Sequence, residues 1–252
     1  MSVELWQIAL LAVTGVAAGI LNVMAGGGSL LSVPVMLFLG LPGPVANGTN
    51  RISIIAQNAV AIRTFFRRGF SDFRLSLSLT TAAIPGSILG AFVGVRLDGV
   101  WFDRVLAAVM LGVLILMQLP SRTREGASLE LTRERLIAGH VLMFGAGAWG
   151  GFIQIGVGFI LMPILHRVLG LDLVRTNMHK VFIAGSYNVV AIVIFASAVS
   201  IHWTFGIALA AGNALGGYLG ARFSVAGGEI WIRRVFTLVL LVFIAKLLLP
   251  SF

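Results

Sequence analysis

The stretch Asn22-Val-Met-Ala-Gly-Gly-Gly-Ser-Leu-Leu-Ser-Val-Pro34 places three consecutive glycines, Gly26 to Gly28, between two apolar runs. Both flanking runs resemble membrane helices. Glycine is the poorest helix former after proline, so a continuous helix is not expected across these residues. The stretch therefore predicts a helix that is broken inside an apolar protein, and the break needs a structural or functional reason.

The composition indicates a polytopic membrane protein. Of the 252 residues, 58% are hydrophobic and 11% are charged, and the mean hydropathy is +1.01; a soluble domain carries about 25% charged residues. The chain has no cysteine, which excludes disulfides and thiolate metal sites. The first run follows Glu4 without a basic start, so it is interpreted as a retained helix and not as a signal peptide.

Ten apolar runs predict an all-α architecture. A crossing of the bilayer takes about 20 residues, and two of the runs are too short for it. We expect these two, 29–40 and 158–170, to be half-helices that return from mid-membrane or short tilted spans. The ten runs lie near residues 5–24, 29–40, 47–66, 75–95, 103–119, 136–155, 158–170, 177–199, 203–223 and 232–250.

The basic residues predict the orientation. Sorted onto alternate sides of the membrane, 14 of the 18 fall on one side, which the positive-inside rule assigns to the cytoplasm. Both termini are therefore expected outside. The same bias explains the net charge of +9 without nucleic acid as a partner. The minority side carries Arg51, Arg96, Arg104 and Lys246.

The two halves are predicted to be inverted copies, with five runs each. Residues 1–120 form the first repeat, 121–135 a cytoplasmic linker, and 136–252 the second repeat. An odd number of segments per half makes the copies antiparallel. Matching positions recur in order: Gly19/Gly151, Asn22/Gln154, Pro34/Pro163, Gly40/Gly170, Asn47/Asn177, Asn58/Asn188, Arg96/Arg222, and the triplets Gly86, Gly90, Gly94 and Gly212, Gly216, Gly220.

Inverted repeats are typical of secondary transporters, whose substrate site lies near the midplane where broken helices meet. Gly26, Gly27, Gly28 and Ser29 in the first half would free backbone N–H groups there, and Gly156 and Gly158 would do so in the second half. Such groups favour an anion. Close helix packing is the alternative, and we favour it for the two glycine triplets with their spacing of four.

Polar side chains inside the apolar runs form the candidate substrate site. Amides and cations suit a small oxyanion. Four alternatives stay open. Asn47 and Asn177 could be N-caps, and Arg51 and Lys180 could reach the interface. Asn58 and Asn188 could form interhelical hydrogen bonds, and Asn22 and Gln154 could cap a broken helix. The candidates are Asn47, Asn50, Arg51, Gln57 and Asn58 in one half, Asn177, His179, Lys180, Tyr187 and Asn188 in the other, and Asn22 and Gln154 before the breaks.

The acidic residues are expected only in loops and at termini. A buried carboxylate relay for protons is therefore not predicted, and proton coupling would need His179 or a protonated substrate. His140, His166 and His202 are interpreted as interfacial. We expect no metal, no cofactor and no catalytic residue. The nine carboxylates are Glu4, Asp72, Asp98, Asp103, Glu125, Glu130, Glu134, Asp172 and Glu229.

Three first-half motifs carry a resemblance to a known family: Ala18-Gly-Ile-Leu-Asn-Val-Met-Ala-Gly-Gly-Gly-Ser-Leu-Leu-Ser-Val-Pro34, Leu39-Gly-Leu-Pro42 and Ala46-Asn-Gly-Thr-Asn50. Together with Gly156-Val-Gly158, Pro163 and Leu169-Gly-Leu171, they make the chain similar to the sulfite exporter TauE/SafE family. Thr176-Asn-Met-His-Lys180 departs from the usual small-residue version. The resemblance implies a carrier of sulfite, thiosulfate or organosulfonates in the bacterial inner membrane.

The function expected from residues and resemblance is a secondary anion transporter working by alternating access, with export as the direction. A passive anion channel is one alternative. An intramembrane hydrolase with Ser29 as nucleophile is another, weakened by the absence of a positioned base. The expected partners are a small anion and membrane lipid. The oligomeric state is left open, and a homo-oligomer is possible.

Overall fold

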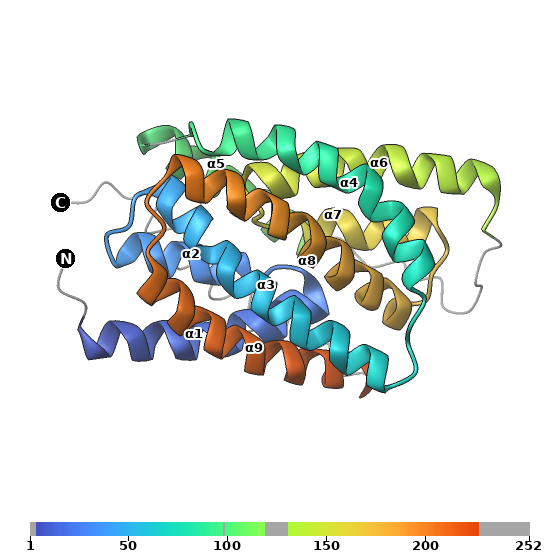
Figure 1. Cartoon of the computed structure of the whole chain (residues 1–252), viewed down its shortest axis with the longest axis horizontal. Helices are drawn as coiled ribbons and strands as arrows, with labels where there is room; N and C mark the ends of the chain where they lie inside the picture. Colours follow the sequence, from blue (N-terminus) through green and yellow to red (C-terminus); the bar gives the residue numbers. More distant parts are fainter. Residues whose placement is uncertain (1–3, 98, 119–130, 227–252) are drawn as a thin grey trace.

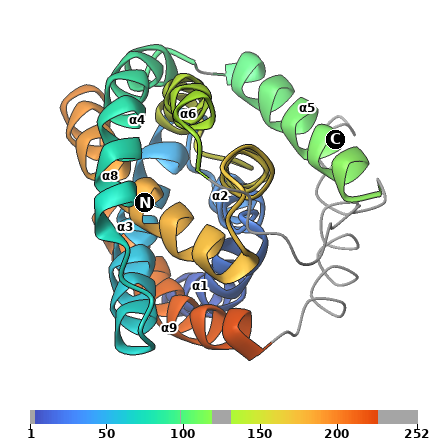
Figure 2. The ribbon, with the colours of Figure 1, turned by 90° about the vertical axis from the view of Figure 1, so that its right-hand side faces the viewer.

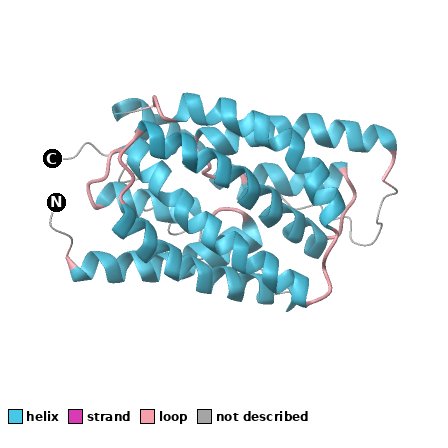
Figure 3. Ribbon diagram, viewed as in Figure 1, coloured by secondary structure: helices cyan, strands magenta, loops and turns pink. Residues whose placement is uncertain are grey.

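The computed structural model describes residues 4–97, 99–118 and 131–226, and the described part is helical (Figure 3). The predicted run 232–250 and most of the linker lie outside these residues. The helices run lengthwise in one elongated bundle (Figure 1). They are α1 Leu5–Ala25, α2 Ser29–Phe38, α3 Gly43–Arg67, α4 Phe73–Gly94, α5 Gly99–Gln118, α6 Arg133–Phe152, α7 Gly158–Pro163, the π-helical turn η1 Ile164–Val168, α8 Leu173–Ala198 and α9 Trp203–Ala226.

The long helices form a curved wall. Successive neighbours in it are α1, α9, α3, α8, α4 and α6. Figure 2, an end view, shows this wall curving around α2, with α5 on the opposite side. By length and composition, α1, α4 and α8 are able to cross a membrane. The all-helical membrane architecture predicted from the composition is therefore confirmed in its coarse form.

The two short apolar helical segments, Ser29–Phe38 and Gly158–Val168, do not have the length of a bilayer crossing. With 10 residues, α2 is about 15 Å long, half of the roughly 30 Å hydrocarbon core. Just after it, Leu39 and Leu41 share one hydrophobic cluster with Leu11 near the start of α1. In the second half, Leu169 after η1 packs on Gly139 near the start of α6. The short lengths and the Leu169–Gly139 contact favour half-helices over tilted spans.

The glycine triplets are packing residues, as predicted. A Cβ at Gly86, Gly90 or Gly94 of α4 would overlap a backbone carbonyl of α6. At Gly212 and Gly216 of α9 it would overlap a carbonyl of α1. The absence of side chains therefore lets two pairs of wall helices approach backbone to backbone.

The expectation that acids lie only in loops and at termini is partly wrong. Asp103 lies in the second turn of α5 and Glu134 in the first turn of α6. Both helices begin earlier than the apolar runs suggested, because charged residues are tolerated in the first turns at a membrane surface. Asp72 and Asp172 cap the starts of α4 and α8.

Candidate functional site

The first break falls where the glycines predicted it. Helix α1 ends at Ala25, and Gly26 has a φ of +79° while its N–H donates to the carbonyls of Asn22 and Leu21. This left-handed C-cap suits glycine, which has no Cβ to resist it. Helix α2 then begins at Ser29, with Gly28 packed against the Ala18 carbonyl.

The second break is built differently. Helix α6 ends at Phe152, and both Gln154 and Gly156 have left-handed φ values, +63° and +71°. Gln154 is held by its side chain, whose Oε1 accepts a hydrogen bond of 2.9 Å from the Tyr187 hydroxyl. Helix α7 begins at Gly158.

The two breaks touch each other. A Cβ at Gly26 would overlap the backbone of Gly158, and a Cβ at Gly158 would overlap the backbone of Gly26. The chain therefore breaks at both places and brings the two breaks into contact. A broken helix and close packing were the two alternatives for Gly26 to Gly28. The structure has both, because the helix ends there and Gly26 packs on Gly158.

Side chains of α3 cap the end of α6. Arg51 is fully buried, and its Nη1 donates to the Gly150 carbonyl at 3.1 Å and its Nη2 to the Gly151 carbonyl at 2.5 Å. Asn47 Nδ2 donates to the Phe152 carbonyl at 2.9 Å. Carbonyls in the last turn of a helix have no partner within the helix, so α3 supplies what α6 lacks.

The predicted polar arrays of α3 and α8 meet at one point. Arg51 Nη1 also donates to Asn188 Oδ1 at 2.9 Å, and the guanidinium lies 4.3 Å from the centre of the Phe195 ring. Asn188 Nδ2 donates to Ala184 on its own helix. Asn188 therefore forms a hydrogen bond between α8 and α3, as the alternative to a substrate-binding role predicted for it.

A second cluster joins α3 to the start of α2. Asn50 Nδ2 donates to Ser29 Oγ at 3.0 Å, and Ser32 Oγ donates to Asn50 Oδ1 at 2.6 Å. Ser53 Oγ donates to the Asn50 carbonyl at 2.7 Å. The sequence reasoning missed Ser32 and Ser53, although both are polar residues within predicted apolar runs.

A third cluster links the end of α1 to the middle of α3. Asn22 Nδ2 donates to Gln57 Oε1 at 3.1 Å, and Gln57 Nε2 donates to Asn58 Oδ1 at 3.2 Å. Asn58 packs against Gly185 of α8. Asn22 and Asn58, far apart in sequence, thus belong to one chain of amides.

On α8 the remaining candidates lie toward the start of the helix. Lys180 Nζ donates to the Val23 carbonyl at 2.7 Å and to Asn177 Oδ1 at 2.8 Å, and Asn177 Nδ2 donates to Ser224 Oγ. His179 Nδ1 lies 2.8 Å from Ser76 Oγ. These three candidates therefore form groups separate from Arg51 and Asn188.

Two alternative readings of the polar residues are wrong. Asn47 and Asn177 are not N-caps, because Pro42 and Asp172 hold those positions and the helices begin before the asparagines. Arg51 and Lys180 do not extend to the interface, because 0% and 3% of their surface is exposed. Both cations are held within the bundle by oxygen atoms of the chain.

Some buried polar atoms have no hydrogen-bond partner in the described structure. Two are donors on α3: Arg51 Nε and Asn58 Nδ2. His179 Nε2 and Asn47 Oδ1 are also without one. A donor left unpaired in an apolar interior costs free energy, so these atoms are the candidates for contact with a ligand or with water. Arg51 Nε and Asn58 Nδ2 fit an anion, which accepts hydrogen bonds.

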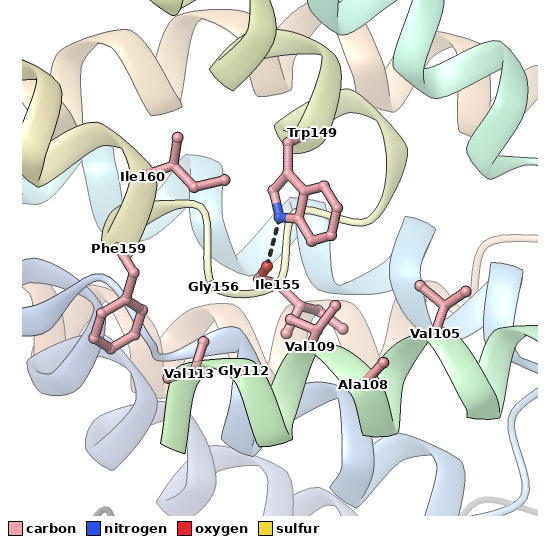
Figure 4. A pocket seen from close by; sticks show the side chains of 10 residues that line it. All are labelled: Val105, Ala108, Val109, Gly112, Val113, Trp149, Ile155, Gly156, Phe159 and Ile160. Atoms are coloured by element: carbon pink, nitrogen blue, oxygen red, sulfur yellow. Dashed lines mark hydrogen bonds between the residues drawn. The ribbon is translucent and has the colours of Figure 1, made fainter. Parts of the chain in front are cut away.

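An apolar cavity of about 370 Å³ lies elsewhere, between α5 and the second break (Figure 4). Val109 and Val113 of α5 face Phe159 and Ile160 of α7 across it, and Trp149 Nε1 donates to the Ile155 carbonyl at 2.9 Å. Its lining offers little to an anion. We therefore place the candidate site in the amide clusters.

Comparisons with known proteins agree with the membrane architecture. A probable membrane transporter protein of Haemophilus influenzae is 25% identical over 98% of this chain and 96% of its own length. The probable membrane transporter proteins ORF9 of Sinorhizobium sp and YfcA of Escherichia coli K12 are each 24% identical, over 96% and 93% of this chain and 92% and 87% of their own lengths. No solved structure matches significantly.

The family profile described as Sulfite exporter TauE/SafE matches residues 11–247, nearly the whole chain. Neither this description nor the names of the relatives refers to an enzyme. Membrane transport is thus indicated by family, relatives and architecture together, and the resemblance carried by the glycine and asparagine motifs is confirmed: the chain belongs to the sulfite exporter TauE/SafE family.

Proposed function

We propose that this protein is a secondary transporter of a small sulfur-containing oxyanion, such as sulfite, thiosulfate or an organosulfonate, and that it exports this anion by alternating access. The observation that carries the proposal is the pair of unpartnered buried donors, Arg51 Nε and Asn58 Nδ2. The chain belongs to a family of membrane transporters, and its helical bundle buries two cations and several amides. An oxyanion would supply the missing acceptors.

The neighbour order of the wall supports the inverted repeat. In the predicted repeat, α1 corresponds to α6, α3 to α8, and α4 to α9. When each helix in the order α1, α9, α3, α8, α4, α6 is exchanged for its counterpart, the result is the same order read backwards. A twofold axis in the membrane plane produces this pattern. Two antiparallel copies that share a central site could expose it to each side in turn.

The hydrolase alternative has less support. Ser29 Oγ accepts its hydrogen bond from the amide of Asn50, and an amide does not take a proton as a general base. The passive channel remains the main competitor. A channel and a carrier differ in their kinetics.

The test is uptake of radiolabelled sulfite into liposomes that contain the purified protein. We expect flux that saturates with concentration and accelerates when unlabelled sulfite is present on the opposite side. Methanesulfonate and thiosulfate should compete, and choline should not. Linear flux without counterflow would favour a channel, and flux no faster than in protein-free liposomes would contradict the proposal.

A further inference from the structure

Two buried cations hold the ends of the two broken helices, and each does so across the boundary between the halves. Arg51, in the first half, bonds Gly150, Gly151 and Asn188 of the second half. Lys180, in the second half, bonds Val23 of the first half. Each cation thus lies at the carbonyl end of a helix, where the helix dipole favours positive charge.

These two links lie on opposite sides of the middle of the bundle. Helices α3 and α8 are antiparallel, since Gly48 near the start of α3 packs on Phe195 near the end of α8. Arg51 lies about two turns after Gly43, the first residue of α3. Lys180 lies about two turns after Leu173, the first residue of α8. At 1.5 Å per residue, both lie about 10–12 Å from opposite ends.

The amide cluster lies between the two links. Asn58, in the middle of α3, packs on Gly185 in the middle of α8. A ligand held by Asn58 would therefore have the Arg51 link toward the face where α3 begins, and the Lys180 link toward the face where α8 begins. In this structure both links are formed.

We propose that Arg51 and Lys180 are the two opposed gates of the transport cycle. Each closes one face by tying the end of one half's broken helix to the other half, and each releases its carbonyls when that face opens. Water or the arriving oxyanion takes over the cation's hydrogen bonds, since a charged oxygen is a stronger acceptor than a carbonyl. Arg51 thus combines anion contact through Nε with the closing of one face through Nη1 and Nη2, and this inference rests on the proposed transport function.

Sided labelling of one thiol tests the gates. The chain has no cysteine, so Ser53→Cys introduces the sole thiol, at a fully buried position of α3. A membrane-impermeant methanethiosulfonate is added to oriented vesicles from one face or the other. Ser71→Cys, in the exposed turn between α3 and α4, identifies the face on which α8 begins, since Phe70 beside it and Val174 near the start of α8 pack against the same hydrophobic cluster.

In the Ser53→Cys background, Arg51→Gln is expected to raise the labelling rate at least tenfold from the face where α3 begins, with no rise from the other face. Lys180→Gln should do the opposite. Arg96→Gln and Arg63→Gln, which remove exposed cations, serve as matched controls and should leave both rates within about twofold.

Equal rises from both faces in each variant would mean that the cations merely stabilise the bundle, and unchanged rates would also overturn the inference. Labelling needs no substrate, so it separates the gates from the proposed function. If labelling changes as predicted but the protein moves no sulfite, only the proposed substrate is contradicted. If the protein moves sulfite but the variants show no sided opening, only the gate proposal is contradicted.

Discussion

Replacing Gly26 with alanine is expected to separate the two helix breaks and to abolish transport. Two costs combine at this residue. An L-residue at a φ of +79° carries a strain of about 1–2 kcal/mol, and the new Cβ would overlap the backbone of Gly158, an overpacking that typically costs about 1–3 kcal/mol. The purified protein should unfold at a clearly lower temperature, and sulfite flux in liposomes should fall to background.

Gly69→Ala is the matched control for Gly26→Ala. Gly69 has a nearly equal φ of +84°, but a Cβ there would meet nothing within 4 Å. Its replacement adds only the backbone strain, so flux should persist and the melting temperature should fall less. If the two variants lose stability and flux equally, the contact between the breaks has no role beyond the turn itself.

Exchange of Asn58 for aspartate is expected to remove anion recognition while keeping the shape of the side chain. The variant retains the oxygen that accepts from Gln57 Nε2 and loses the unpartnered Nδ2 donor. A hydrogen bond to a charged group contributes about 1.5–3 kcal/mol, and 1.4 kcal/mol is tenfold in affinity. The affinity for sulfite should therefore fall about 10–100-fold, and further if the new carboxyl ionises and repels the anion.

The control for this exchange is Asn213→Asp on α9. Asn213 is buried as Asn58 is, but its unpartnered atom is the acceptor Oδ1. The half-saturation concentration for sulfite flux measures both variants, with melting temperatures to confirm folding. Unaltered half-saturation in folded Asn58→Asp would remove Asn58 from the site.

Local sequence signals predicted the helix breaks well. Three adjacent glycines strongly disfavour a continuous helix, and a glycine spacing of four is a packing pattern, so Gly26 to Gly28 and the two triplets could be interpreted from local physics. The contact between Gly26 and Gly158 could not, because it depends on how two halves of the chain dock. The second break was also less readable, since its left-handed residues include Gln154, which needs Tyr187 to hold it.

The polar residues were found from sequence, but their partners were not. Apolar runs containing Asn, Gln, Arg and Lys were enough to select the candidates. The apolar runs began later than the helices do, so Asn47 and Asn177 lay at apparent helix starts and could be taken for caps. The partners of Arg51 are backbone carbonyls of α6, and any residue has a carbonyl, so no sequence pattern marks them.

The central claim is that a sulfur oxyanion binds among the amides between the halves, and a crystal structure with selenite tests it most directly. Selenite has the charge and shape of sulfite, and its selenium is located by anomalous scattering. We predict one strong peak with its oxygens within hydrogen-bond distance of Asn58 Nδ2 and Arg51 Nε. A peak in the apolar cavity beside α5, or none in the bundle of a protein saturated with selenite, would contradict the claim.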